Sequence, residues 1–335
     1  MKPRILVARA TFPETLDRLA QHCEVEANQQ DAILSADALR ERMRGKDGVI
    51  VTSSERLSAE LIAGLSASMA DNQPRLKVIS NVAVGYNNID VAAATRAGIM
   101  VTNTPDVLNE TTADHAWTLL MASARRVSES ERWLRAGNWR HWRYDQFLGA
   151  DVHGATLGIL GMGRIGQAIA RRSIGFGMRV LYHNRTRLSP EQEAQANHAR
   201  HVSKEALLRE ADHLVLMLPY SADTHHAVGA AELALMKPSA TLVNIARGGI
   251  VDDVALIAAL REGRLAAAGL DVYENEPVLH PDFLTLPNVV LTPHIGSASE
   301  RTRRAMAECA SDNLIAALCD ERPPNLVNPD YADRN

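Results

Sequence analysis

The sequence predicts an α/β protein built from two doubly wound parallel sheets, with one domain inserted into the other. Three observations lead to this prediction. The chain has 335 residues, which is too long for one ordinary core and fits two domains of common size. Short β-branched runs alternate with helical patterns, as in parallel sheets covered on both faces. A proline-containing break, Thr104-Pro105-Asp106, separates a first alternating series from a second.

Each series predicts its own set of strands. In the first series we expect strands at Ile5–Ala8, Val49–Thr52, Lys77–Asn81 and Ile99–Asn103. In the second we expect them at Thr156–Leu160, Arg179–His183, His213–Leu218, Thr241–Ile245, Ala267–Asp271 and Val289–Thr292. Apolar positions at helical spacing predict one long helix from about Glu110 to Ala136 and a final helix from about Ala298 to Leu318.

The final helix decides the predicted domain boundaries. It is too short to form a domain, so we expect it to return to the N-terminal domain and make that domain discontinuous. The predicted domains are therefore 1–106 with 300–335, which we expect to bind substrate, and 107–299, a Rossmann-like domain inserted between those two segments.

Composition limits the classes of function. The chain is 46% hydrophobic and 23% charged with a formal net charge of −4, which favours a globular protein and gives no electrostatic case for nucleic acid or an anionic membrane. No stretch approaches the roughly 18 apolar residues of a membrane span. Three scattered cysteines indicate reduced thiols in a cytoplasmic protein. The adjacent pair His225-His226 has no further ligands near it in the sequence, so no metal site is predicted.

A glycine-rich segment points to a nucleotide. Gly161-Met-Gly163-Arg164-Ile165-Gly166 follows an expected strand and opens a helical run. In that context the glycines permit a tight turn and a close approach of the backbone to a pyrophosphate, and the start of the helix favours an anion. An ordinary strand–helix turn is the alternative. We predict a dinucleotide site formed by Gly161, Gly163, Arg164, Ile165 and Gly166.

The end of the next strand indicates which dinucleotide binds. NAD sites commonly place Asp or Glu about 20 residues after the glycine loop, on the ribose 2′-hydroxyl. Here the segment reads Asn184-Arg185-Thr186-Arg187, without an acidic residue. Arginine pairs well with a phosphate, so these residues favour NADP(H), with NAD(H) still possible. The alternative is that the arginines are simply exposed turn residues.

Three residues that follow strand ends suit hydride transfer to a keto acid. Arg247, Glu276 and His294 all come after expected strands, where open α/β sheets bind their ligands. A guanidinium can hold a carboxylate or carbonyl oxygen, and histidine can supply a proton. A neighbouring carboxylate favours the imidazolium and fixes its orientation. Each residue alone has an ordinary explanation, but together, downstream of a dinucleotide loop, they predict catalysis.

These motifs make the chain similar to the D-isomer-specific 2-hydroxyacid dehydrogenase family, over nearly its entire length. The resemblance rests on Gly161–Gly166, Asn244-Ile-Ala-Arg-Gly-Gly-Ile-Val-Asp-Asp, Ala267-Ala-Gly-Leu-Asp-Val-Tyr-Glu-Asn-Glu-Pro and Thr292-Pro-His-Ile-Gly-Ser-Ala. Within the family, Met162, Asp151-Val-His and Cys309-Ala-Ser-Asp-Asn-Leu resemble the bacterial glyoxylate/hydroxypyruvate reductases and 2-ketogluconate reductases.

The resemblance implies roles for individual residues. Arg247 would orient the substrate, His294 would be the general acid/base, and Glu276 its carboxylate partner. The residues implied beside the cofactor, besides the glycine loop, are Asn184, Arg185, Thr186, Leu218, Pro219, Thr224, Ile245, Ala246, Asp271 and Gly296. The loop Val82–Asp90 resembles the family's substrate loop, which would bind a carboxylate through the backbone of Val84 and Gly85; an ordinary strand-to-helix turn is the alternative.

The resemblance also implies a twofold homodimer through the cofactor domains. Trp142, in the aromatic arm Trp139–Tyr144, best matches a residue that related reductases reach into the neighbouring active site; dimer-interface packing is an equal alternative. The expected function is NADPH-dependent reduction of glyoxylate, hydroxypyruvate or 2-ketogluconate in the cleft between the domains. A phosphoglycerate- or lactate-type NAD dehydrogenase and a nucleotide-sensing corepressor-type protein remain alternatives.

Overall fold

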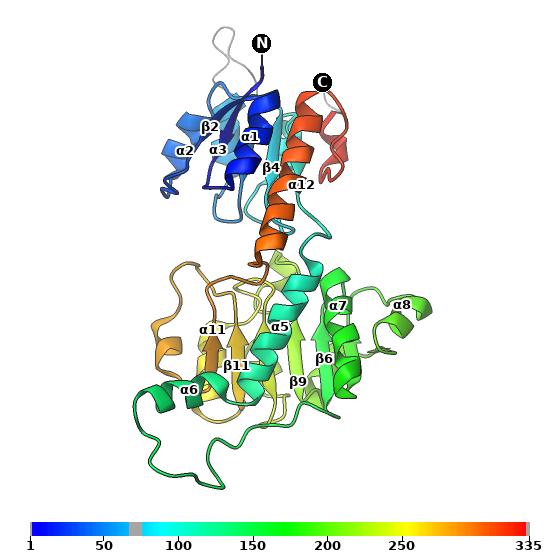
Figure 1. Cartoon of the computed structure of the whole chain (residues 1–335). Helices are drawn as coiled ribbons and strands as arrows, with labels where there is room; N and C mark the ends of the chain where they lie inside the picture. The colour runs from blue at the N-terminus through cyan, green and yellow to red at the C-terminus, as the bar shows by residue number, and fades with distance from the viewer. Residues whose placement is uncertain (1, 67–75, 333–335) are drawn as a thin grey trace. The chain divides into compact units, whose positions relative to one another are not determined.

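The chain folds into two compact α/β units. The computed structural model describes residues 2–66 and 76–332. Unit 1 comprises Met1–Leu108 and Ser299–Asn335, and unit 2 comprises Asn109–Ala298. In each unit a parallel sheet has helices on both faces (Figure 1). The predicted fold class, with one unit inserted between two segments of the other, is confirmed.

In the described part of unit 1, five parallel strands lie in the order β2-β1-β3-β4-β5. This is a doubly wound order, in which the chain starts inside the sheet and moves outward in both directions. The strands are β1 Arg4–Val7, β2 Glu24–Ala27, β3 Gly48–Val51, β4 Val78–Asn81 and β5 Met100–Thr102. The sequence did not predict β2, because Glu24-Val-Glu-Ala is polar and partly exposed.

Helices cover both faces of the unit 1 sheet. The helices are α1 Pro13–His22, α2 Ala36–Met43, α3 Ala59–Ser66, α4 Val91–Arg96 and α12 Glu300–Leu318, with a 3-10 turn at Pro329–Ala332. Ile5 packs with residues of α1 and α12, whereas its neighbour Leu6 packs with residues of α2 and α3. This alternation explains why the central strands β1, β3 and β4 are buried at nearly every position.

Unit 2 has seven described strands, all parallel, in the order β12-β11-β10-β9-β6-β7-β8. The strands are β6 Thr156–Leu160, β7 Arg179–His183, β8 Arg200–His201, β9 His213–Leu216, β10 Thr241–Asn244, β11 Ala267–Leu270 and β12 Val289–Leu291. The strand order reverses at β6, which pairs with β7 on one side and β9 on the other. Ligands of doubly wound sheets bind at the carboxyl ends of strands beside such a reversal.

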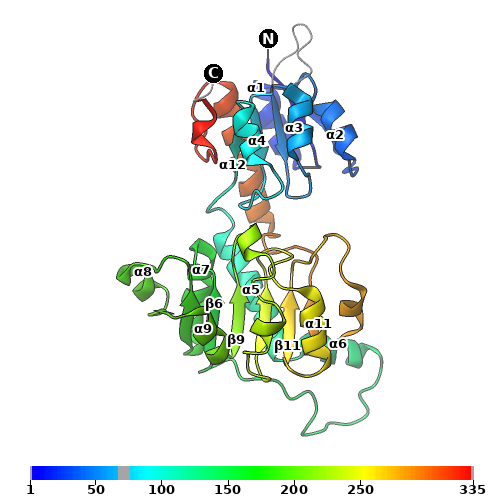
Figure 2. The ribbon, with the colours of Figure 1, turned by 180° about the vertical axis from the view of Figure 1, so that it is seen from behind.

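The helices of unit 2 also form two layers. They are α5 Asn109–Ala124, α6 Val127–Arg135, α7 Arg164–Arg172, α8 Pro190–Gln195, α9 Lys204–Glu210, α10 Ala230–Leu233 and α11 Asp253–Arg261, with 3-10 turns at Ser173–Phe176, Ala222–Thr224 and Pro281–Thr285. Figure 1 shows α5 and α7 in front of the sheet, and the reverse view in Figure 2 shows α9 and α11 in front.

The prediction of one helix from Glu110 to Ala136 is wrong. The chain forms two helices, α5 and α6, because Arg126 adopts a left-handed conformation with φ of 53°. The Arg126 guanidinium pairs with Glu129 and lies over the Phe147 ring, so contacts outside the helix support the break. The apolar spacing continues across it, which is why the sequence did not show it. Among the described helices, none is both long and apolar enough to cross a bilayer.

Candidate active site

The glycine loop lies at the strand-order reversal, between β6 and α7. Gly161 has φ of +104°, and a Cβ on it would lie 2.6 Å from the backbone of Met217. A Cβ on Gly166 would lie 2.5 Å from the carbonyl oxygen of Gly161. Gly163 begins α7 with open space beside its Cα. The loop is therefore tight where it turns and open where it meets solvent, which fits a cradle for a pyrophosphate.

The loop after β7 is joined to the glycine loop. Asn184 Oδ1 accepts a hydrogen bond from the Met162 backbone N–H at 2.6 Å. Arg187 makes two hydrogen bonds of 2.8 Å to Glu193, whose carboxylate also accepts from the Tyr182 hydroxyl at 2.7 Å. These contacts lower the pKa of Glu193 to about 2. Arg187 is thus engaged by a carboxylate of α8.

Arg185 differs from Arg187 in its contacts. Arg185 and Thr186 are exposed. Within residues 2–66 and 76–332, Arg185 has no hydrogen-bond or ion-pair partner. The loop after β7 therefore offers an unengaged guanidinium two positions before the engaged one.

The loop after β9 is a closed turn. It contains Leu218, Pro219 and Thr224, which the sequence placed beside the cofactor. The Thr224 hydroxyl donates to the Pro219 carbonyl and accepts from the Ser221 N–H, both at 2.8 Å. These bonds fix the turn, so the side chain of Thr224 supports the loop.

Arg247 follows β10 in a turn that rests against the turn after β11. Asn244 braces it, since its side chain donates to the Arg247 carbonyl and accepts from the Ala246 N–H, both at 3.1 Å. A Cβ on Gly248 would overlap the Tyr273 carbonyl oxygen, so only glycine permits this contact. Burial lowers the pKa of Arg247 and the charge of Glu276 opposes that shift, but a guanidinium stays protonated. Ile245 and Ala246 are buried beneath the turn.

His294 and Glu276 form a close pair. The distance from His294 Nδ1 to Glu276 Oε2 is 2.7 Å, and the other carboxylate oxygen accepts from the Tyr273 N–H at 2.8 Å. The side chains are 36% and 31% exposed. Because Nδ1 is engaged, Nε2 is the ring nitrogen that remains to exchange a proton with a ligand. The pair therefore has the geometry of an oriented general acid.

Asp271 lies beneath this pair, at the end of β11, and is 1% exposed. Its carboxylate accepts from the Thr292 hydroxyl at 2.7 Å and from the backbone N–H groups of Ile295 and Gly296 at 2.8 Å. Burial alone would raise the pKa of Asp271, but hydrogen bonds from His115, Thr292 and Ile295 outweigh it and lower the pKa. Asp271 is therefore a buried carboxylate that stays charged.

The sequence did not single out His115, Thr292 or Asn244 as supporting residues. His115 lies on α5, far from Asp271 in the chain, and its Nε2 is 3.3 Å from Asp271 Oδ1. Nothing in its local sequence distinguishes it from an ordinary helix residue. Only the packing of α5 on the sheet brings the two together.

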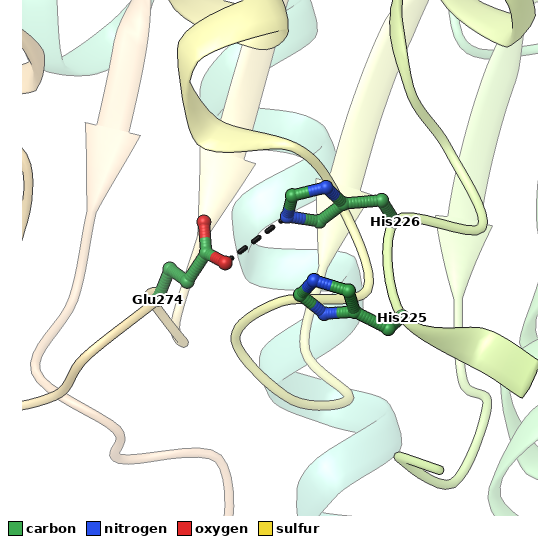
Figure 3. Close-up of side chains that lie close together, drawn as sticks. All are labelled: His225, His226 and Glu274. Carbon is green, nitrogen blue, oxygen red and sulfur yellow. Dashed lines mark hydrogen bonds and ion pairs between the residues drawn. The ribbon is translucent and has the colours of Figure 1, made fainter. Parts of the chain in front are cut away.

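The structure also adds a carboxylate to the pair His225-His226. Figure 3 shows Glu274 beside them, with its Oε1 3.0 Å from His226 Nε2. Among the described residues these three form one cluster with metal-ligating side chains. The two rings are stacked, with centroids 3.9 Å apart and planes 24° from parallel. The absence of a metal stays a prediction.

Val84 and Gly85 lie in unit 1, in the loop after β4. Their carbonyl oxygens accept hydrogen bonds from Asn103 at 2.8 Å and from Asn81 at 3.0 Å. In a trans peptide the N–H points away from the C=O, so these bonds turn the following N–H groups to the opposite side. The loop thus has a fixed orientation.

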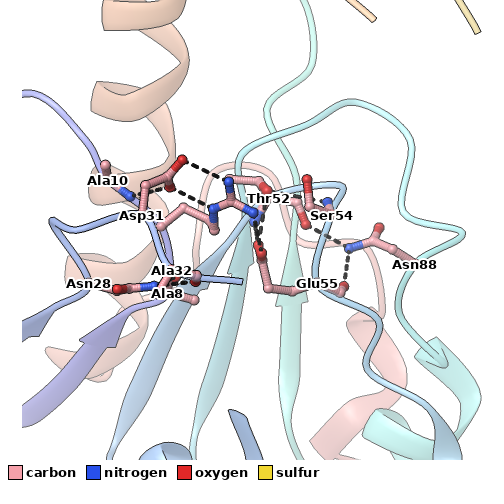
Figure 4. A network of polar contacts seen from close by, with 10 residues as sticks. Ala8, Ala10, Asn28, Asp31, Ala32, Thr52, Ser54, Glu55 and Asn88 are labelled. Atoms are coloured by element: carbon pink, nitrogen blue, oxygen red, sulfur yellow. Dashed lines mark hydrogen bonds and ion pairs between the residues drawn. The ribbon is translucent and has the colours of Figure 1, made fainter. Parts of the chain in front are cut away.

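A second polar network occupies the same edge of the unit 1 sheet (Figure 4). Arg9 makes two hydrogen bonds to Asp31, at 2.7 and 2.8 Å, and lies 3.5 Å from Glu55. Glu55 accepts from the N–H and hydroxyl of Thr52, and Asn88 donates to the carbonyls of Thr52 and Glu55. This network ties together the loops that follow β1 and β3.

Trp142 lies in the arm between α6 and β6 and is 72% exposed. Its ring packs edge-to-face on Tyr144, which is also exposed.

Unit 2 brings the predicted catalytic residues, Asp271 and the glycine loop to one edge of its sheet, because carboxyl ends of parallel strands share an edge. Trp142 is held in its own arm, and Val84 and Gly85 belong to unit 1.

The chain is similar to known proteins of one family. Residues 117–296 match the model of the D-isomer specific 2-hydroxyacid dehydrogenase, NAD binding domain. The chain is 49% identical to a glyoxylate reductase of Thermococcus gammatolerans over 98% of this chain and 96% of the relative. It is 46% identical to a glyoxylate reductase of Pyrococcus furiosus over the same shares of the two chains.

A solved structure is similar along the whole chain. The NADPH-dependent glyoxylate/hydroxypyruvate reductase from Sinorhizobium meliloti, in complex with NADP and malonate, superposes with a TM-score of 0.85 at 36% identity. The match covers 99% of this chain and 98% of that one. The chain is thus an NAD(P)-dependent oxidoreductase that reduces a keto acid to a hydroxy acid. It belongs to the D-isomer specific 2-hydroxyacid dehydrogenase family.

Proposed function

We propose that the chain reduces a small 2-keto acid to the D-2-hydroxy acid, with NADPH preferred over NADH. Glyoxylate, hydroxypyruvate and 2-ketogluconate are the candidate substrates. The observation that carries the proposal is the 2.7 Å pair of His294 and Glu276, on the sheet edge that also holds Arg247 and the glycine loop. The relatives named glyoxylate reductase support the substrate class.

The three catalytic candidates divide the work of the reduction. A bound nicotinamide supplies the hydride that the carbonyl carbon receives. His294 donates the proton from Nε2 to the carbonyl oxygen, and Glu276 holds Nδ1 so that the ring is aligned beforehand. Arg247 binds the carboxylate or the carbonyl oxygen with permanently charged, planar donors.

The dinucleotide lies along unit 2 in this proposal. The residues proposed to contact it are Gly161, Gly163, Arg164, Ile165, Gly166, Asn184, Arg185, Thr186, Leu218, Pro219, Thr224, Ile245, Ala246, Asp271 and Gly296. Arg185 binds the 2′-phosphate, supported by its unengaged guanidinium within the described residues and by the lack of an acidic residue at Asn184. The NADP complex of the S. meliloti enzyme supports the same preference.

Unit 1 is proposed to bind the substrate and unit 2 the dinucleotide. The backbone at Val84 and Gly85 binds the substrate carboxylate, which is consistent with the fixed direction of their peptide groups. Trp142 either contacts substrate in a partner's active site or packs in a dimer interface, and its exposure suits both. A homodimer formed through unit 2 and a cytoplasmic location remain predictions from the sequence.

The test follows oxidation of NADPH and NADH at 340 nm with the three acids. We expect turnover, faster with NADPH, and the fastest acid identifies the substrate. His294→Ala should lower kcat by about 100- to 10,000-fold, the usual contribution of a positioned acid, with NADPH binding kept. His226→Ala is the matched control, because His226 also pairs with a glutamate on this edge. Loss of NADPH binding in His294→Ala, or NADPH binding by the wild type with no turnover of any acid, refutes the proposal.

A separate variant tests the cofactor preference. Arg185→Ala removes a charged hydrogen-bond donor worth about 1.5–3 kcal/mol, so the KM for NADPH should rise about 10- to 100-fold. The KM for NADH, which has no 2′-phosphate, should stay within about twofold. An equal rise in the KM for NADPH and for NADH would show that Arg185 supports the loop and does not bind the 2′-phosphate.

A further inference from the structure

The contact between Thr292 and Asp271 fixes where the hydrogen atoms lie. An ionised carboxylate can only accept, so the 2.7 Å bond between these side chains uses the single hydrogen of the Thr292 hydroxyl. His115 Nε2 lies 3.0 Å from the same hydroxyl oxygen and 3.3 Å from Asp271 Oδ1. Neither of those oxygens has a hydrogen left to give it. His115 Nε2 must therefore carry a hydrogen and donate it toward both oxygens.

Asp271 in turn holds the segment that carries His294. Its backbone carbonyl accepts from the His294 N–H at 2.9 Å, and its carboxylate accepts from the N–H groups of Ile295 and Gly296. His294 itself has φ of 54°, a left-handed conformation that strains a non-glycine residue and persists only when its surroundings impose it. The bonds to Asp271 are the contacts that impose it.

His115 comes from outside this segment. It lies on α5, which packs against β10, β11 and β12, and its side chain is 13% exposed. Asp271 and Thr292 follow β11 and β12, so the His115 N–H bridges two neighbouring strand ends from the helix layer. A donor in that place fixes Asp271 and Thr292 relative to each other, and with them the turn at 292–296.

We propose that His115 is a positioning residue for the reduction: its Nε2–H locks Asp271 and Thr292 together and so sets the place of His294 against Glu276. It acts through these residues and touches neither substrate nor cofactor. The inference rests on the proposed role of His294 as the proton donor.

Two substitutions at His115 separate a donor from a space-filling side chain. His115→Phe keeps a ring but has no N–H, whereas the amide of His115→Gln can place a donor near the position of Nε2. A misplacement of about 1 Å in a reacting group costs up to 100-fold, so His115→Phe should lower kcat about 10- to 100-fold. His115→Gln should retain kcat within about threefold, and the KM for the keto acid should change less than kcat in both.

Thr292→Val provides a second route to the same network if His115→Phe does not fold. It removes the hydroxyl and should lower kcat as His115→Phe does, and the double variant should lose little more, because both act on one carboxylate. Thr118→Val, on the exposed side of α5, is the control and should keep full activity. Circular dichroism melting confirms that each variant is folded.

The outcomes are distinguishable. A folded His115→Phe with kcat within twofold of wild type overturns the inference, as does a His115→Gln that loses as much as His115→Phe. If His294→Ala remains active, the proposed function fails first. If His294→Ala is inactive while His115→Phe and Thr292→Val are active, only the positioning role fails.

Discussion

Replacing Glu276 by glutamine changes one atom of the close polar contact between Glu276 and His294. Glu276 Oε2 lies 2.7 Å from His294 Nδ1, and Oε1 accepts from the Tyr273 N–H. Glutamine keeps the shape but loses the charge, and its single carbonyl oxygen cannot serve both donors. A bond to a charged group contributes about 1.5–3 kcal/mol and a neutral one about 0.5–1.5 kcal/mol, so the imidazolium loses about 1–1.5 kcal/mol of stabilisation.

This loss converts directly to rate. A barrier change of about 1.36 kcal/mol is tenfold, so the loss corresponds to about 5- to 13-fold in kcat. The two side chains are 36% and 31% exposed, and solvent screens the charge, so we expect the lower half of that range, about five- to ninefold. The deficit is measured from pH 6 to pH 9.

The assay is NADPH oxidation with glyoxylate across that pH range, with NADPH affinity measured by fluorescence. Glu274→Gln is the matched control, because Glu274 lies two residues earlier and pairs with His226 at 3.0 Å. It removes a similar charge near the same edge and should leave kcat unchanged. A Glu276→Gln enzyme with wild-type kcat at every pH, or a Glu274→Gln enzyme with the same deficit, would refute the reasoning.

Three further variants test other parts of unit 2. Arg247→Lys keeps the charge but loses the planar fork, so kcat/KM for the keto acid should fall about 10- to 100-fold; an unchanged value would remove Arg247 from the site. Gly161→Ala places a Cβ 2.6 Å from the Met217 backbone, so the melting temperature should drop and the KM for NADPH rise, whereas Gly175→Ala, with open space, should be neutral. Burial raises the pKa of Asp253 from 3.8 to about 6, so the folded state loses stability as the pH rises from about 4, where the unfolded chain ionises, to about 6. Asp253→Asn should therefore stabilise the protein by up to about 3 kcal/mol more at pH 8 than at pH 4, and equal melting-temperature changes at both values would contradict the assignment.

The sequence alone sufficed for the architecture because its signals are local. Parallel strands such as β6 and β10 are buried at every position and mostly apolar, and the predicted runs coincide with them to within about a residue. The strands it missed, β2 and β8, are a polar edge strand and a two-residue strand, which carry little of that signal. The break at Arg126 was missed for a related reason, since a single left-handed residue leaves the apolar spacing intact.

The features of the candidate site also fall into those that the sequence could predict and those that it could not. Arg247, Glu276 and His294 could be chosen from the sequence because each follows a strand end, and carboxyl ends of parallel strands share an edge. Whether a chosen side chain is free or engaged depends on neighbours distant in the chain. Glu193 accepts hydrogen bonds from Arg187 but not from Arg185, and Glu274 lies within hydrogen-bond distance of His226. His115 contacts Asp271 from helix α5, which covers the sheet.

By itself, the sequence determined the fold class, the family and the residue types at the strand ends, because apolar periodicity and short motifs indicate all three. The tertiary structure alone decided which of Arg185 and Arg187 is engaged by Glu193, which ring nitrogen of His294 contacts Glu276, and which helix supports Asp271. These are properties of pairs of side chains, and a pair exists only once the sheet and its helix layers have packed.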